Sequence, residues 1–85
     1  MDLSKLQKIQ TRIEELKNDN SVLSQPGVQR DNELHRIEEW RAELLTIRLD
    51  DLEREGLDFA EVAAATDDLS IILARVARRF EESVS

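Results

Sequence analysis

The sequence of 85 residues contains no cysteine and no tyrosine, and it has only one proline, two glycines, one histidine and one tryptophan. Without cysteine, the chain cannot form disulfide bonds, bind metal through thiolates or use a cysteine nucleophile. With two glycines, it offers few of the tight loops that hold phosphate groups. These absences remove disulfide-stabilised folds and several classes of enzyme site from consideration.

Positive charge and long apolar runs are also scarce. The chain carries 12 basic and 19 acidic side chains, a formal charge of −7. This balance opposes general attraction to nucleic acid and to anionic membrane surfaces. No apolar run reaches the roughly 18–20 residues of a membrane-spanning helix, and the first residues lack the basic start and apolar core of a signal peptide. We expect a cytoplasmic protein without membrane contacts.

The aliphatic residues that are present recur with helical spacing, and no segment alternates as a strand would. Two turn signals divide the chain. The first is at residues 24–27, where proline and glycine are adjacent, and the second is Gly56, which suits a helix C-cap. We therefore predict a single all-α domain over residues 1–85, with helices at about 3–24, 29–55 and 58–83.

The first segment carries a narrow apolar stripe that includes one polar residue. Its members follow alternating steps of three and four residues: Leu6, Ile9, Ile13, Leu16, Asn20 and Leu23. A strict stripe of this kind is typical of a coiled-coil seam, and a polar residue within a seam can fix register or partner number. We interpret Asn20 as a candidate for that role, with the alternative that it meets water near the following turn.

The middle segment has two apolar stripes. The first consists of Ile37, Trp40, Leu44 and Ile47, and the second of Leu34, Leu45, Leu49 and Leu52. An arc this wide requires contacts on two sides, so we expect this helix at the centre of the fold, against the other segments or a second subunit. Trp40 is interpreted as a core residue, an interface anchor or both.

Two arginines, Arg41 and Arg48, fall between these stripes. The simplest interpretation is that their stems cover apolar neighbours while the guanidinium groups reach water or carboxylates. The alternatives are an interhelical ion-pair ladder that selects a partner and an anion site. No glycine-rich loop accompanies the pair, which argues against the anion site.

The apolar residues of the third segment keep one phase across Thr66, which favours a single long helix. They are Phe59, Val62, Thr66, Leu69, Leu73, Val76, Phe80 and Val84. The alternative is a kink or a new helix capped at residues 66–68.

The opposite side of the third segment carries Ile71, Arg75, Arg78 and Glu82, where Ile71 is either an ordinary exposed aliphatic residue or a protein contact. Acidic residues flank the arginines at 67–68 and 81–82, so we interpret this part as a solvated helix end of mixed charge. Residues 59–70 faintly resemble a helix-turn-helix, but two aspartates replace the turn glycine and would repel phosphate groups.

Residues that could support catalysis are few. His35 is the single histidine, and its neighbours Glu38 and Glu39 complete no established metal or catalytic pattern. We therefore predict that the chain is not an enzyme and has no catalytic, cofactor-binding or metal-binding residues.

The sequence favours a protein-interaction module, such as a small assembly factor, adaptor or regulator, that acts through helix–helix association. The three helices are expected to run up, down and up, or to form an extended hairpin, and to pair into a homodimer. A monomeric bundle is the structural alternative. The functional alternative is a small DNA-binding transcriptional regulator or antitoxin-like protein that uses the third helix.

The expected partners are a second copy of the chain and another protein, whereas nucleic acid and membranes are not expected. The candidate interface residues are Leu6, Ile9, Ile13, Leu16, Asn20, Trp40, Arg41, Leu44, Arg48, Ile71 and Arg75.

Overall fold

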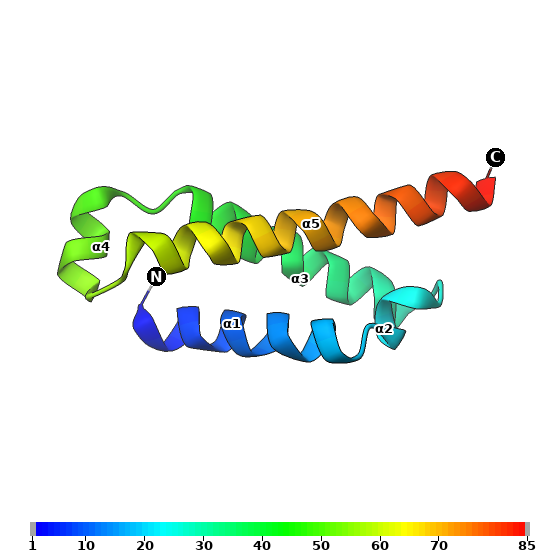
Figure 1. Cartoon of the computed structure of the whole chain (residues 1–85), viewed down its shortest axis with the longest axis horizontal. Coiled ribbons are helices and arrows are strands. Elements are labelled where there is room, and N and C mark those ends of the chain that lie inside the picture. The colour runs from blue at the N-terminus through cyan, green and yellow to red at the C-terminus, as the bar shows by residue number, and fades with distance from the viewer. Residues whose placement is uncertain (1, 85) are drawn as a thin grey trace.

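The computed structural model describes the backbone of residues 2–84 and the side chains of residues 2–78. The described chain is all-helical, as the sequence predicts, and measures 46 × 21 × 19 Å. Its helices are α1 (Leu3–Asn18), α2 (Ser21–Ser24), α3 (Val28–Leu45), α4 (Leu49–Glu55) and α5 (Phe59–Val84). Figure 1 shows α1 and α5 running in one direction and α3 returning, with α4 at one end of the molecule.

The single helix predicted at residues 3–24 is wrong, because the chain leaves the helical conformation at Asp19. This residue has φ −146° and ψ 103°, and its carboxylate accepts a hydrogen bond from the Ser21 N–H at 3.0 Å. Such local bonds compete with helix continuation, and here the bond also lowers the pKa of Asp19. The short α2 that follows packs on α3.

The helix predicted at residues 29–55 is also two helices, separated by residues 46–48. The Thr46 hydroxyl donates a hydrogen bond to the Glu43 carbonyl at 2.9 Å, which closes the end of α3. Arg48 is extended, with φ −92° and ψ 159°, so the chain changes direction before α4. Thr46 and Ile47 are β-branched, which slightly lowers their helix propensity. The break contains no glycine and no proline.

α4 ends at a left-handed glycine, which confirms the predicted C-cap. Gly56 has φ 68° and ψ 31°, and its N–H donates to the Glu53 carbonyl at 3.4 Å. The Leu57 N–H donates to the Leu52 carbonyl at 2.8 Å, which completes a Schellman motif. Both leucines are buried, so the motif ties the end of α4 to the core.

α5 is continuous from Phe59 to Val84, so no helix-turn-helix forms at residues 59–70. Within α5, the Thr66 hydroxyl donates to the Val62 carbonyl at 2.9 Å, a bond that a helix accommodates without a break. α5 contacts both α3 and α1. The predicted positions of Phe80 and Val84 on its apolar side lie outside the described side chains.

The core lies where α1, α3 and α5 meet. Its buried apolar side chains are Leu6, Ile9, Ile13, Leu16, Leu23, Ile37, Trp40, Leu44, Leu52, Leu57, Val62, Ala65 and Leu69. α3 contacts α5 and α2, and α5 contacts α3 and α1, so α3 is no more central than α5. Every helix therefore contributes at least one side chain to a single apolar cluster.

Candidate interaction surface

The apolar stripe of α1 is covered within the chain. Leu6 and Ile9 have no exposed surface, and Ile13 and Leu16 are 3% and 4% exposed. They share one cluster with Leu44 and other side chains of α3 and α5. These five interface candidates are therefore core residues in the folded chain, and the three–four spacing reflects intramolecular packing and not a seam left open for a second copy.

Asn20 lies outside this buried stripe. It is exposed at the N-cap of α2, where its side chain makes no capping hydrogen bond. Its backbone carbonyl accepts hydrogen bonds from the Leu23 N–H at 3.0 Å and the Ser24 hydroxyl at 3.2 Å. The break after α1 thus turns Asn20 toward solvent, so it is not the polar member of a coiled-coil seam.

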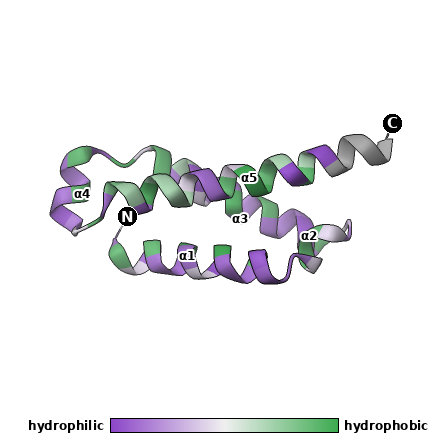
Figure 2. Cartoon of the chain, in the orientation of Figure 1, coloured by the Kyte–Doolittle hydropathy of each residue, from purple (hydrophilic) through white to green (hydrophobic). Residues whose placement is uncertain are grey.

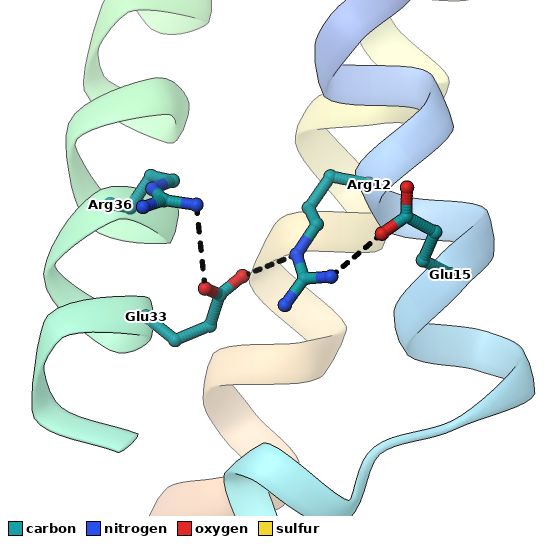
Figure 3. Close-up of polar contacts among 4 residues, drawn as sticks. All are labelled: Arg12, Glu15, Glu33 and Arg36. Carbon is teal, nitrogen blue, oxygen red and sulfur yellow. Dashed lines mark hydrogen bonds and ion pairs between the residues drawn. The ribbon is translucent and has the colours of Figure 1, made fainter. Parts of the chain in front are cut away.

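A buried carboxylate links α3 to α1, and the sequence did not reveal it. The side chain of Glu33 is 7% exposed, and its Oε1 accepts a hydrogen bond from Arg12 Nε at 2.8 Å. Arg12 also lies 2.7 Å from Glu15, and Arg36 lies 3.6 Å from the other oxygen of Glu33 (Figure 3). The hydrogen bond to Glu33 raises the pKa of Arg12. This network holds α1 and α3 in one relative register.

The remaining candidates of the middle segment are separated from one another. Trp40 is buried, and the guanidinium carbon of Arg36 lies 5.9 Å from the centre of its ring, within cation–π range. Arg41 Nε donates a hydrogen bond to Ser70 Oγ of α5 at 2.7 Å. Arg48 is exposed in the break before α4. Because the helix ends between Arg41 and Arg48, the two form neither an ion-pair ladder nor a shared anion site.

An apolar groove opens where α3, α4 and α5 meet. Three large apolar side chains remain exposed there: Leu45 by 58%, Leu49 by 74% and Phe59 by 65%. The groove extends between them to the core residues Leu44 and Leu52. Figure 2 shows hydrophobic stretches near the beginning of α4, at the end of the molecule where the chain passes from α3 to α5.

The break at residues 46–48 creates this groove. A continuous helix would have kept Leu45, Leu49 and Leu52 on one stripe, but after the break only Leu52 reaches the core. Phe59 was predicted on the buried side of the third helix, and this prediction is wrong. It is the first residue of α5, beside the groove, so its ring stands in solvent.

The segment that forms most of the groove is rich in acidic residues, and one of them lines the groove. Residues 45–67 contain seven acidic side chains and two basic ones. One of the two basic groups, Arg54, is paired with Asp51. Asp67 lines the groove itself, and Asp58 accepts a hydrogen bond from the Ala60 N–H at 2.9 Å. A rim of this sign repels other acidic surfaces and attracts basic ones.

The outer side of α5 carries charges of both signs. Ile71 is 48% exposed, and Arg75 and Arg78 are exposed on the same side. The three arginines of residues 69–80 are preceded by two aspartates at 67–68 and followed by two glutamates at 81–82. Arg75 also lines a pocket with Leu16 and Lys17 of α1. Among the side chains that the structure describes, neither Arg75 nor Arg78 forms an ion pair.

The described residues offer little other chemistry. His35 is exposed, with Nε2 lying 3.0 Å from Glu39 Oε1. Among the described side chains, those of residues 2–78, no group of acidic, histidine or cysteine residues could hold a metal ion. In the part of the chain that the structure describes, no helix is long and apolar enough to cross a membrane. Comparisons with models of known families, with curated proteins and with solved structures give no match for this chain. Inference about function therefore depends on the groove and the charged faces.

Proposed function

We propose that the chain is a non-enzymatic protein-interaction module that acts through helix–helix association, as a small assembly factor, adaptor or regulator does. The observation that carries this proposal is the exposure of Leu45, Leu49 and Phe59 around one groove. Adjacent exposed side chains of this size are typical of a protein contact, whereas single exposed ones are ordinary. Burying each of them fully would contribute about 1.5–3 kcal/mol before the costs of association.

A helix is the occupant that suits such a groove. An amphipathic helix lays residues spaced by three, four and seven positions into an apolar groove bounded by other helices. Leu45, Leu49 and Phe59 would flank its apolar side, and the acidic rim would select for basic residues at its edges. We place the module in the cytoplasm as a bundle whose long helices run up, down and up, with the groove at the α4 end.

The predicted homodimer through the first helix and the alternative of a DNA-binding protein both lose support. A homodimer through the first helix needs the stripe from Leu6 to Leu16, and those side chains are already covered within the chain. A DNA-binding helix-turn-helix needs a turn inside residues 59–70, where α5 is continuous. Among the described side chains, the groove keeps three large exposed apolar residues, Leu45, Leu49 and Phe59, in one place.

Site-specific photo-cross-linking tests the proposal. A benzoylphenylalanine would replace Leu49, and the same residue at Val28 is the matched control, because both positions carry an aliphatic side chain that is 74% exposed. In the native cell we expect one defined protein to be cross-linked from position 49 and not from position 28. Equal products from both positions, or no product from position 49, would contradict the proposal.

Purification of the cross-linked protein completes the test. It should bind the wild-type chain, and it should bind the variant with Leu49→Ser and Phe59→Ser about tenfold more weakly or worse, as expected for the loss of interface anchors. Val28→Ser should leave the affinity unchanged. Equal binding by all three chains would show that the groove is not the contact surface.

A further inference from the structure

We propose that residues 46–48 are a hinge, through which the chain exchanges between the bent form of the structure and a straight form in which α3 and α4 make one helix. In the bent form α3 ends at Leu45 and α4 begins at Leu49. The proposal rests on the proposed interaction function, because the groove belongs to the bent form and the hinge would regulate it.

The hinge residues themselves allow a helix. Thr46, Ile47 and Arg48 include neither glycine nor proline, and Thr46 already has right-handed helical angles, φ −95° and ψ −2°. Arg48 is extended, although arginine is among the better helix formers. Rotation about a few backbone bonds therefore suffices to join the two helices.

The break leaves backbone groups without helical partners. The first backbone hydrogen bond of α4 runs from the Leu52 N–H to the Arg48 carbonyl, at 3.1 Å. Within the described chain, the N–H groups of residues 48–51 donate to no carbonyl four residues earlier, and the Arg48 side chain does not cap them. In the straight form these four groups would donate to the carbonyls of residues 44–47.

The same break divides an apolar stripe. Leu45, Leu49 and Leu52 are spaced by four and three residues, which places them on one side of a continuous helix. In the bent form only Leu52 is buried, and Leu45 and Leu49 are 58% and 74% exposed. In the straight form Leu49 and Leu52 would lie about 6 and 10 Å beyond Leu45 along one axis, so the three would not enclose the groove.

Other contacts favour the bent form. Leu52 and Leu57 are each 8% exposed, and the Leu57 N–H donates to the Leu52 carbonyl at 2.8 Å. Asp50 and Asp51 lie in the first turn of α4, where carboxylates stabilise a separate helix N-terminus. The bent form thus gains buried leucines and favourable charges at a helix end, whereas the straight form gains backbone hydrogen bonds. A ligand of one form can shift such a balance.

α5 must follow α4, because only residues 56–58 join the two helices. Straightening would break the hydrogen bond from Arg41 Nε to Ser70 Oγ, which links α3 and α5 in the bent form. The apolar residues of α5 recur every three or four positions, so a slide by one turn would put another apolar residue in each place. The straight form would therefore keep an apolar interface between α3 and α5.

The distance between two spin labels measures the two forms directly. The chain has no cysteine, so Asn32→Cys and Glu53→Cys, both at exposed positions, provide the labelling sites. A straight helix separates the backbones at positions 32 and 53 by about 32 Å, and any bend shortens this distance. The wild type should show a major population at the shorter distance and a minor one at the longer.

Substitutions at the start of α4 should shift these populations in opposite directions. Leu49→Pro should remove the longer distance. Arg48 already has the extended angles that precede proline, and proline suits the first position of α4. Inside a straight helix proline is disfavoured by about a hundredfold or more. Asp50→Ala should increase the longer distance about threefold or more, because it removes a first-turn carboxylate and adds the best helix former.

Two controls accompany these variants. Leu49→Ala removes the same side chain as Leu49→Pro without restricting the backbone, so it should retain both distances. Labels at Glu61→Cys and Arg78→Cys, both exposed on α5, should give one distance of about 25 Å in every variant, because α5 is continuous. A single short distance in the wild type and in Asp50→Ala would overturn the proposal, and so would a longer distance that survives in Leu49→Pro.

Binding separates the hinge from the proposed function. Adding the protein cross-linked from position 49 should deplete the longer distance, because the groove exists only in the bent form. Unchanged populations in the bound chain would overturn regulation by the hinge. If no protein is cross-linked from position 49, the proposed function is contradicted, and the label distances alone decide the hinge. A chain that binds this protein but shows only the short distance would overturn the hinge while the proposed function stands.

Discussion

Arg12 Nε on α1 lies 2.8 Å from Glu33 Oε1 on α3, and the Glu33 side chain is 7% exposed. Among the described side chains, Glu33 is the one charged residue that is buried. A buried carboxylate is strongly unfavourable without a partner, so this contact restricts how α1 can sit on α3. Lys5 and Glu43, 2.7 Å apart, link the same two helices at a second point.

Arg12→Ala should lower the free energy of unfolding by about 1–3 kcal/mol, because it removes a hydrogen bond from a buried charge. Glu15→Ala should change it by less than about 0.5 kcal/mol, because that carboxylate is exposed. Urea unfolding followed by circular dichroism measures both. Equal effects of the two substitutions would show that Glu33 does not depend on Arg12. Replacing both members of the pair, Arg12→Met with Glu33→Leu, should restore wild-type stability or exceed it.

Asn20→Leu should change neither stability nor oligomeric state, because the Asn20 side chain is exposed and makes no capping hydrogen bond. We expect a change in unfolding free energy within about 0.5 kcal/mol, as for other surface substitutions. Light scattering and thermal unfolding of the variant measure the two properties. A clear rise in melting temperature together with a new oligomeric state would restore the interpretation of Asn20 as part of a seam.

Substitutions in the groove should separate binding from stability. Leu49→Ser should change the unfolding free energy by less than about 0.5 kcal/mol, because its side chain is 74% exposed. Leu52→Ala should lower it by about 2–4 kcal/mol, because that leucine is 8% exposed and fills the core. Urea unfolding of both variants is the measurement. A large loss for Leu49→Ser would mean that the groove closes in solution.

Gly56→Ala should lower the unfolding free energy by about 1 kcal/mol, because Gly56 has φ 68°, a conformation that costs other residues energy. Gly56→Asn should lose less, since asparagine tolerates this region better. The difference between the two variants in urea unfolding isolates the backbone effect. Identical losses would indicate that backbone strain is not the cause.

The sequence predicted most of the core of α1 and α3 correctly. Three–four spacing identified Leu6, Ile9, Ile13 and Leu16, all of which are buried, because the spacing defines one side of a helix. It could not show what covers that side. A helix of the same chain and a helix of a second copy can both cover such a stripe. The spacing alone therefore could not distinguish an intramolecular core from a dimer seam.

The breaks in the long helices were not predictable from glycine and proline. The interruptions at residues 19–20 and 46–48 contain neither residue, and they depend on local hydrogen bonds of Asp19 and Thr46. The second break leaves Leu49 exposed and so creates the groove. Helical periodicity cannot predict this groove, because it does not show where a helix breaks. Asp67 was visible in the sequence as part of an acidic pair, but only the fold places it at the edge of an apolar groove.

The buried ion pair illustrates a different limit. Arg12 and Glu33 are 21 residues apart, and each lies among other charged residues. Pairing them requires the relative position of two helices, which the spacing within either helix does not contain.

Amide spectra of the isotope-labelled chain, recorded as the protein cross-linked from position 49 is added, test most directly whether the groove is the contact surface. The account predicts that chemical shifts change at residues 45–67, while those of residues 6–16 stay constant. Changes confined to residues 6–16 would contradict it, and so would a spectrum that remains unchanged when the added protein is in excess.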